Sequence, residues 1–263
     1  MIDNSELAVE PSTEVEARPD CFHSTSIAMA PSPLSISEAY ELWAPTYDLA
    51  PNPLLALEAR TVEPLFPGLT GRRALDIACG TGRWLQRLLE LGASSGLGVD
   101  FSSAMLAIAT KKPDLRGRLV RADCLSVPFR SHVADLIMCS FALAHLPELN
   151  GFVGELARLA RCGADLYITD VHPEGYKAGW RSSFHNGQTV VEIPTYTRSR
   201  NQILRAFEAG GFQVVDCVEP HFEEVDRPIF VQAKKGYLYQ EVCQIPAVLI
   251  CHFTHSEKSW PTA

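Results

Sequence analysis

Short apolar runs alternate with amphipathic segments through the middle of this chain, and that alternation restricts the possible folds more than any other feature of the sequence. The runs predict strands over residues 73–78, 96–100, 118–122, 134–140 and 164–171. The segments between them predict helices over residues 82–91, 102–112 and 147–160. Strands that alternate with helices form a parallel sheet with helices on both faces, so we expect an α/β fold with one dominant core.

The regions on either side are less regular. Residues 1–34 are rich in Ser, Pro and Glu, show no sustained period, and are expected to be a disordered tail. A helix should begin near Ser37 and stop at Pro45, and a second should span residues 52–65. After the fifth strand we expect, in order, an irregular insertion (175–195), a helix (198–209), a strand (212–218), a partly helical connection and a seventh strand (247–253).

The acidic balance of the chain argues against several classes of partner. The 263 residues carry a formal net charge of −8, whereas a nucleic-acid track requires a basic face, so we expect no nucleic-acid partner. No apolar run approaches the roughly 18 residues of a membrane-spanning helix, and the polar, acidic N-terminus does not resemble a secretory signal. The eight cysteines form no C-x-x-C pair and no His/Cys cluster, so we expect reduced thiols, no metal and a cytoplasmic protein.

Two glycines follow the first predicted strand in the stretch LDIACGTGRW, which runs from Leu75 to Trp84. A P-loop needs a lysine after its last glycine, and none follows Gly82. A dinucleotide loop needs a third glycine, and Leu85 occupies that position. A third possibility is a ligand with a cationic group and no phosphate. Asp76 would then attract an ammonium, and the backbone N–H groups of the turn would receive a carboxylate.

Two further acids end the next two predicted strands. Asp100, in GVDFSSAML, can accept both hydroxyls of a ribose, or it can simply cap the following helix. Asp123, in RADCLSVPF, can accept from an exocyclic amine such as that of adenine, or it can be a solvated turn residue. Apolar walls would come from Phe101, Cys124 and Leu125. The three acidic positions suit an amino-acid zwitterion, a ribose and an adenine, which are the parts of S-adenosylmethionine.

At this point the sequence resembles the class I S-adenosylmethionine-dependent methyltransferases, and among them the type 11 bacterial group that includes ubiquinone and menaquinone methyltransferases. The resemblance lies in LDIACGTGRW, GVDFSSAML, RADCLSVPF and DLIMCSFALAHLPEL, which occur in the expected order between residues 74 and 170. It is weaker in YELWAPTYDLAPNP and in the last two strands. Ala78 replaces the first glycine of the usual loop, and RLARCGADLYITD lacks the usual Lys-Pro-Gly-Gly turn.

The resemblance implies a Rossmann-like, mostly parallel sheet of seven strands in the order 3-2-1-4-5-7-6, with strand 7 antiparallel. It also implies S-adenosyl-L-methionine over the carboxyl ends of strands 1 and 2. The methionine part of the cofactor is assigned to Asp76, Ala78, Cys79, Gly80, Thr81, Gly82 and Ser140. The ribose is assigned to Asp100, and the adenine to Phe101, Met105, Asp123 and Cys124. Tyr47 is assigned to a lid that covers the cofactor.

One domain, residues 35–263, should contain all of these elements. We divide it into an N-terminal helical lid (35–70), a cofactor-binding core (71–171), a substrate-side insertion (172–197) and a final helix with strands 6 and 7 (198–263). Because the insertion has no clear period, it could be a lid, a pocket roof or an ordinary hairpin.

Residues beyond strands 4 and 5 could face the methyl acceptor, since ligands of open α/β sheets bind outside the carboxyl ends of the strands. His145 is the candidate general base, with a packing or capping role as the alternative. The candidate substrate contacts are Phe141, Asp170, His172, Arg181 and His185. The helical stripe of Tyr40 and Trp43 is expected to pack on the core.

The function that the sequence indicates is methyl transfer from S-adenosyl-L-methionine to a small molecule, with S-adenosyl-L-homocysteine as the product. Such a transfer is an in-line displacement, so the protein mainly aligns the reactants and excludes water. An NAD(P)-dependent Rossmann oxidoreductase and a non-catalytic S-adenosylmethionine-binding module are the alternatives. No motif identifies the methylated atom, and both a monomer and a homodimer are compatible with the sequence.

Overall fold

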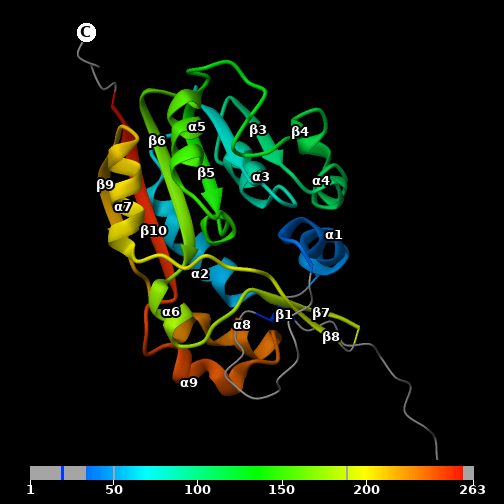
Figure 1. Ribbon diagram of the computed structural model, residues 1–263. Coiled ribbons are helices and arrows are strands. Elements are labelled where there is room, and N and C mark those ends of the chain that lie inside the picture. Colours follow the sequence, from blue (N-terminus) through cyan, green and yellow to red (C-terminus); the bar gives the residue numbers. More distant parts are fainter. Residues whose placement is uncertain (1–18, 21–33, 50, 188, 257–263) are drawn as a thin grey trace, which may run out of the picture.

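A seven-stranded sheet forms the centre of the computed structural model, which describes residues 19–20, 34–49, 51–187 and 189–256 (Figure 1). Its spatial order is β4-β3-β2-β5-β6-β10-β9. The strands are β2 (Arg73–Ile77), β3 (Ser95–Asp100), β4 (Leu119–Arg121), β5 (Ala134–Ser140), β6 (Ala160–Val171), β9 (Phe212–Val218) and β10 (Val248–His255). Counted along the chain, this is the order 3-2-1-4-5-7-6, so the predicted topology is confirmed.

The direction of the strands also matches the prediction. The neighbours from β4 to β6 pair in parallel, whereas β10 runs antiparallel to both β6 and β9. Parallel strands are covered on both faces, so their side chains are apolar in near-continuous runs, as in β5, where five of seven residues are buried. The carboxyl ends of β2, β3, β4 and β5 therefore meet along one edge of the sheet.

Helices cover both faces of the sheet. On one face, α5 (Asn150–Leu159) and α7 (Arg200–Ala209) bury Phe152, Leu156, Ile203 and Phe207 against the strands. On the other face, α2 (Pro53–Val62) and α3 (Arg83–Glu90) bury Leu54, Leu57, Trp84 and Leu88. The segment between β9 and β10 adds η4 (Glu224–Asp226), α8 (Arg227–Gln232), η5 (Gly236–Leu238) and α9 (Tyr239–Val242), so the prediction of a partly helical connection is confirmed.

The first helix of the domain, α1 (Ile36–Tyr47), continues through Pro45, so the predicted stop at this proline is wrong. A proline removes one backbone hydrogen bond and clashes with the preceding turn, but this one lies in the last turn, where little helix follows it. A capping box between Ser35 and Glu38 starts the helix, and the buried Trp43 anchors it. The packed helix therefore tolerates the proline.

The insertion forms a hairpin, which was one of the interpretations left open by the sequence. After α6 (Pro173–Lys177), strand β7 (Ser183–Asn186) pairs antiparallel with β8 (Thr189–Glu192). Phe184 of β7 stacks on Trp43 of α1, with ring centroids 5.1 Å apart and planes within 4°. The hairpin thus supports α1 from the side away from the sheet (Figure 1).

Most of the predicted tail lies outside the described residues. Within it, β1 (Pro19–Asp20) pairs with β7 in a small three-stranded sheet, and the disorder of the tail stays a prediction. The other short elements of the domain are η1 (Glu63–Leu65), α4 (Ser103–Ala109), η2 (Pro113–Leu115) and η3 (Leu143–His145).

Candidate functional site

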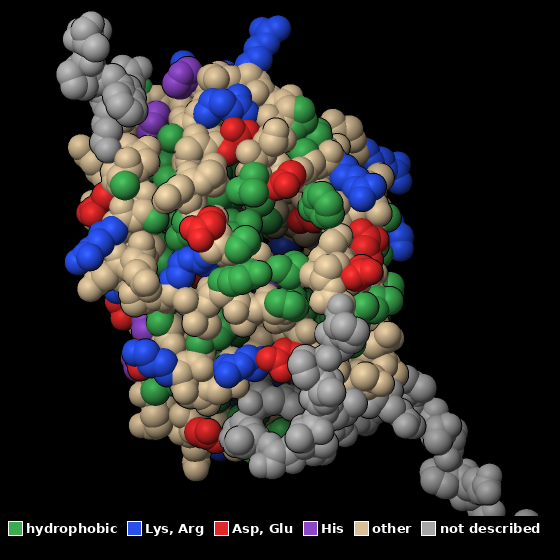
Figure 2. All heavy atoms as spheres, in the orientation of Figure 1, with side chains coloured by type: hydrophobic (Ala, Val, Ile, Leu, Met, Phe, Trp, Pro, Cys, Tyr) green, Lys and Arg blue, Asp and Glu red, His purple; other side chains and the backbone are tan. Residues whose placement is uncertain are grey.

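A cavity of about 320 Å³ lies where α1 crosses the carboxyl ends of β2 to β5. This is within the range of small-molecule pockets, roughly 300–1,000 Å³. Figure 2 shows a hollow at this place, between α1 and the β3–β4 region, edged largely by hydrophobic side chains. Its lining consists of Ile36, Ser37, Tyr40, Tyr47, Ala78, Gly80, Val99, Asp100, Phe101, Ser102, Met105, Ala122, Asp123, Cys124, Ser140, Phe141, Ala142, His145 and Leu146.

The loop after β2 turns beneath this cavity by means of left-handed residues. Gly80 has a φ of 54°, and a Cβ atom built there would meet no other atom within 4 Å. Because Gly80 lines the cavity, its missing side chain leaves room for a ligand close to the backbone. Ala78 adopts a φ of 56° without being glycine, a strain of about 1–2 kcal/mol. Such strain in a residue that lines a cavity is typical of functional loops.

Asp100 connects this loop to the N-terminus of α4. Its Oδ2 accepts from the Gly80 N–H at 2.7 Å, and its Oδ1 accepts from the Ser102 N–H at 2.8 Å. Burial raises the pKa of the carboxyl, although the two backbone hydrogen bonds oppose this shift. Each carboxylate oxygen has a second lone pair, so Asp100 can still accept hydroxyl groups of a ligand in the cavity. The N-cap of α4 is Ser102, so Asp100 fixes the capping residue and can also accept from a ligand.

The far wall of the cavity follows β4. Asp123 lines it, and its Oδ1 accepts from the Leu125 N–H at 2.9 Å. Cys124 lines the cavity beside it, and burial raises the pKa of its thiol to about 12, so the group is neutral and apolar at pH 7. Met105 is almost fully buried, and Phe101 is 52% exposed at the rim. An apolar slot with one carboxylate at its edge suits a flat ring that carries an amino group.

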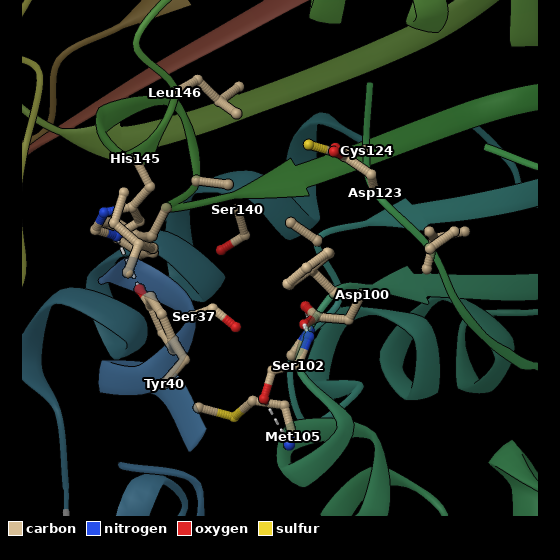
Figure 3. A pocket seen from close by; sticks show the side chains of 18 of the residues that line it. Ser37, Tyr40, Asp100, Ser102, Met105, Asp123, Cys124, Ser140, His145 and Leu146 are labelled. Carbon is tan, nitrogen blue, oxygen red and sulfur yellow. Dashed lines mark hydrogen bonds between the residues drawn. The ribbon is translucent and has the colours of Figure 1, made fainter. Parts of the chain in front are cut away.

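The structure brings most of the predicted cofactor residues together. The predicted residues that line the cavity are Tyr47, Ala78, Gly80, Asp100, Phe101, Met105, Asp123, Cys124 and Ser140. The predicted residues outside the lining are Asp76, Cys79, Thr81 and Gly82. Figure 3 shows Asp100, Asp123 and Cys124 on one side of the cavity, with Tyr40 and His145 on the other.

Asp76 does not lie at the mouth of the cavity, where the sequence placed it. Its carboxyl is buried and accepts from the Leu85 N–H of α3 at 2.8 Å. Burial raises its pKa to about 7, against the lowering effect of this hydrogen bond. This contact ties the first turn of α3 to β2. Asp76 is not among the residues that line the cavity, so its contact with an ammonium group stays a prediction.

The other three predicted residues outside the lining, Cys79, Thr81 and Gly82, stabilise the loop through contacts with the rest of the protein. The Thr81 hydroxyl donates to Asp48 Oδ1 at 2.8 Å, and Lys112 Nζ donates to the Thr81 carbonyl at 2.8 Å. A Cβ on Gly82 would lie 2.4 Å from Leu115 Cδ1, so the glycine is needed for close packing. Cys79 is buried, and its N–H donates to the carbonyl of Val99 on β3 at 2.9 Å.

A buried ionic network under the cavity was not predicted. Glu58 of α2 is fully buried and pairs with Arg83, the residue that follows the loop. The Ser140 hydroxyl donates to Glu58 Oε1 at 2.7 Å, and Arg83 Nη2 donates to the same hydroxyl at 3.2 Å. Thr169 of β6 also donates to Glu58. The signal in the sequence was a glutamate on the apolar face of α2, four residues after Leu54.

Tyr40 and His145 form a hydrogen-bonded pair in the cavity (Figure 3). Tyr40 Oη lies 2.8 Å from His145 Nε2, and His145 Nδ1 lies 3.2 Å from the Pro194 carbonyl. A carbonyl only accepts, so this contact assigns the ring proton to Nδ1, and Nε2 then accepts from the Tyr40 hydroxyl. Burial lowers the pKa of His145, so the imidazole is neutral at pH 7. Tyr40 packs against the apolar cluster around Trp43, as expected, and it also lines the cavity.

A second, smaller hollow of about 40 Å³ adjoins the first and shares with it Tyr40, Tyr47, Phe141 and His145. Trp43 and Asp170 also line it. Asp170 accepts from the N–H groups of Ala144 and Val171 at 2.8 and 2.7 Å, and burial raises its pKa to about 6. The rest of its lining is mixed and consists of Asn52, Leu54, Leu55, Val171 and Ser182.

The remaining predicted substrate contacts lie elsewhere. His172 caps α6 by accepting from the Glu174 N–H at 3.1 Å, and its Nε2 lies 3.0 Å from Glu219. Arg181 donates to the carbonyls of its neighbours Tyr176 and Trp180. His185 lies on β7 and lines neither hollow. Neither hollow is lined by His172, Arg181 or His185, so their contacts with a substrate stay predictions.

Neither a metal-binding cluster nor a membrane-spanning helix occurs among the described residues. No group of three or more His, Cys, Asp or Glu side chains in that part of the chain could hold a metal ion. None of the helices that the structure describes has the length and apolar character needed to span a bilayer.

Comparison with known proteins places a methyltransferase domain over residues 74–163. Demethylmenaquinone methyltransferase from Thermus thermophilus is 33% identical over 139 residues, which are 49% of this chain and 63% of that protein. The protein of the same name from Bacillus licheniformis is 31% identical over 114 residues, 41% of this chain and 49% of that protein. The chain thus spans between 49% and 63% of the length of these curated relatives.

The fold is also found among solved structures. The crystal structure of an S-adenosylmethionine-dependent methyltransferase from Mesorhizobium loti matches with a TM-score of 0.62 and 21% identity, over 78% of this chain and all of that one. At this identity the likeness extends to the fold.

Proposed function

We propose that the chain is a class I S-adenosylmethionine-dependent methyltransferase, as its matched domain and its fold indicate, and that it transfers a methyl group from S-adenosyl-L-methionine to a small-molecule acceptor. One observation carries the proposal. A single cavity at the carboxyl edge of the sheet places Asp100, Asp123 and the open face of Gly80 opposite a paired tyrosine and histidine. A nucleotide-like cofactor and an acceptor can therefore meet in one space.

The residues that line the cavity fit the cofactor. Asp100 accepts the ribose hydroxyls, and Asp123 accepts from the adenine amino group between the apolar walls of Met105 and Cys124. Ser140 lies at the methionine end, where the buried Glu58–Arg83 pair beneath it fixes its hydroxyl. When bound, S-adenosylmethionine supplies an electrophilic methyl group and leaves as S-adenosylhomocysteine.

The Tyr40–His145 pair handles the acceptor's proton in this proposal. An acceptor that arrives as a hydroxyl gives its proton to Tyr40 Oη while the tyrosine's own proton moves to His145 Nε2. The Pro194 carbonyl holds the ring in the required tautomer. The imidazolium that forms then loses the Nε2 proton to water, which returns the Tyr40–His145 pair to its starting form.

The aromatic side of the main cavity favours an acceptor with a planar, largely apolar body. Tyr40, Tyr47 and Phe141 line this side, next to His145. Two relatives are named as demethylmenaquinone methyltransferases, so a demethylmenaquinone-type compound is the first acceptor to test.

The proposal extends to partners and location. We propose a monomer or homodimer without a nucleic-acid partner, and a cytoplasmic location, which suits the seven free cysteines of the described residues. Sedimentation of the purified protein and fractionation of the host cell would test these points.

Ligand-induced stabilisation separates the proposed function from its alternatives. At one hundred times its dissociation constant, a ligand stabilises the folded protein by about 2.7 kcal/mol. We expect both S-adenosylmethionine and S-adenosylhomocysteine to raise the melting temperature and NAD to leave it unchanged. A response to NAD alone would instead indicate an oxidoreductase. Cofactor binding without product, after incubation with labelled cofactor and a host lysate, would indicate a binding module.

A further inference from the structure

Two cysteine thiols face each other on neighbouring strands, outside the cavity. Cys217 on β9 and Cys251 on β10 are direct partners in the antiparallel register, and their Sγ atoms lie 3.2 Å apart. Side chains directly opposite each other in such a pair have Cβ atoms roughly 4.5–5.5 Å apart, close to the 3.5–4.5 Å that a disulfide needs. The pair can therefore be joined by a small local movement.

The surroundings of Cys217 favour its thiolate. The Cys251 thiol lies at hydrogen-bond distance, and Arg200 Nε donates to the sulfur of Cys217 at 3.3 Å. The contact from Cys251 lowers the pKa of Cys217, with Arg200 adding to the effect and burial opposing it. At pH 7 a larger fraction of this thiol is therefore ionised than of an ordinary cysteine.

The Cys217 thiol is more accessible to solvent than the Cys251 thiol, as expected if Cys217 attacks the oxidant and Cys251 resolves the product. Cys217 is half-buried, whereas Cys251 is 1% exposed and belongs to the apolar cluster beneath α7. Strand β9 is the last strand of the sheet and is paired only on the β10 side. The register shifts between His252 and Phe253, next to Cys251. An edge strand beside a local irregularity can move by the ångström that bond formation requires.

We propose that Cys217 and Cys251 are a modification site at which a hydroperoxide forms a reversible disulfide. The Cys217 thiolate attacks the peroxide oxygen and breaks the O–O bond, which gives a sulfenic acid and, after protonation, one molecule of water or alcohol. Cys251 then attacks the sulfenic sulfur, its proton leaves with the hydroxyl as water, and the S–S bond forms. Two electrons pass from the thiols to the peroxide, so the reaction is balanced.

Oxidation would also change the ionic contacts at this edge. Arg200 Nε lies 2.8 Å from Glu219 Oε1, and Glu219 lies 3.0 Å from His172, which caps α6. The disulfide removes the thiolate from Arg200 and leaves Glu219 as its anionic partner in this cluster. The thiol pair is thereby connected to the segment that follows β6.

Thiol mapping of the intact protein tests the proposal. The reduced, folded protein is treated with hydrogen peroxide, its free thiols are blocked with iodoacetamide, and the digest is analysed by mass spectrometry. We expect a peptide that links Cys217 to Cys251 and that dithiothreitol separates. Cys162→Ser is the matched control, because it removes a more exposed thiol and should leave the link intact. In Cys251→Ser, dimedone should instead trap a sulfenic acid on Cys217.

Alkylation rates give a second test that does not depend on the folding of a variant. In the unmodified protein at pH 7, Cys217 should react with iodoacetamide faster than the more exposed Cys162. Arg200→Met should slow the reaction of Cys217 by up to about tenfold as its thiolate fraction falls. Absence of the linked peptide after peroxide treatment, or a Cys217 rate no higher than that of Cys162, would overturn the proposal.

Discussion

At the scale of single residues, Asp100 shows how one side chain can serve both the fold and a ligand. Its carboxylate fixes the Gly80 loop and the first turn of α4 with two backbone hydrogen bonds, and it also lines the cavity. A carboxylate held in this way loses little conformational entropy when a ligand arrives. The same two contacts explain why the sequence alone could not separate a helix cap from a ribose contact.

Asp100→Asn should weaken S-adenosylmethionine binding by about 10- to 100-fold, because hydrogen bonds to a charged acceptor contribute about 1.5–3 kcal/mol. The amide also presents an N–H₂ group to one of the two backbone donors. Isothermal titration calorimetry measures the change, with Asp114→Asn as the control, since Asp114 is an exposed acid of η2. Equal dissociation constants for both variants would refute the ribose assignment.

Tyr40 and His145 should act together on the acceptor. His145→Gln should lower kcat by about 10²- to 10⁴-fold for an acceptor that arrives protonated, while S-adenosylmethionine binding changes by no more than a few fold. Burial lowers the pKa of His145, so the neutral base is lost only as the pH falls below its ordinary value of about 6.5. The pH–rate profile should therefore show an acid limb below pH ~6.5 that disappears in the variant. A limb that persists in His145→Gln would assign it to another group.

At the scale of elements, α1 is held over the cavity by polar contacts toward α4 and the loop after β2, and by an apolar cluster around Trp43 toward the hairpin. Glu41 accepts from the Ser102 hydroxyl at 2.9 Å and from the Ala104 N–H at 3.1 Å, at the N-terminus of α4. At the end of α1, Asp48 accepts from Thr81 and lies 3.5 Å from Lys112. Polar contacts of this kind exchange readily with water, so the side of α1 that faces α4 should be easier to open than the side that carries Trp43.

Glu41→Gln should loosen α1 because the amide can no longer accept at both oxygens. Hydrogen exchange of the α1 amides should become several-fold faster, while the strands of the sheet stay protected. S-adenosylmethionine should bind more weakly and should restore part of the protection. Glu90→Gln, on the exposed side of α3, is the control. Unchanged exchange in α1 would show that the aromatic contacts alone hold this helix.

The loop that begins α3 depends on a glycine for geometric reasons. Gly82 has a φ of 78°, and a Cβ there would lie 2.4 Å from Leu115 Cδ1. Gly82→Ala should therefore lower the free energy of unfolding by about 1–3 kcal/mol, as measured by urea denaturation. Gly68→Ala is the matched control, because a Cβ at Gly68 meets nothing within 4 Å. A similar loss in both variants would show that the packing of α3 tolerates the extra atom.

At the scale of the whole molecule, the sequence predicts the sheet because each strand–helix unit carries its own local signals. Asp100 and Asp123 could be located from the sequence, since strand ends meet at one edge of a parallel sheet. Tyr40, Glu58 and Arg83 could not, because their roles depend on how α1 and α2 pack against distant strands. Packing between distant segments also explains two differences from the predictions. The packing of α1 outweighs the destabilising effect of Pro45 on the helix, and the hydrogen bond to α3 sets the orientation of the Asp76 side chain.

A buried acid with a raised pKa should make the folded protein less stable as the pH rises from about 4 to about 7. Burial raises the pKa of Asp76 to about 7 in the folded state, whereas an unfolded aspartate has a pKa of about 3.9. Between these two values the folded state binds the proton and the unfolded state does not. This group therefore stabilises the fold fully below pH ~4, and its contribution is lost as the pH rises toward 7.

Asp76→Asn keeps the acceptor for the Leu85 N–H and removes this titration. Relative to the variant, the wild-type free energy of unfolding should fall by up to about 1.4 kcal/mol for each pH unit between pH ~4 and ~7, and then stay level. Asp170, whose pKa is raised to about 6, is present in both proteins and cancels in the difference. Urea denaturation across this pH range, with Asp114→Asn as the control, measures the slope. Parallel pH profiles for the wild type and Asp76→Asn would show that Asp76 stays ionised in the fold, and that its contact with α3 is that of a charged carboxylate.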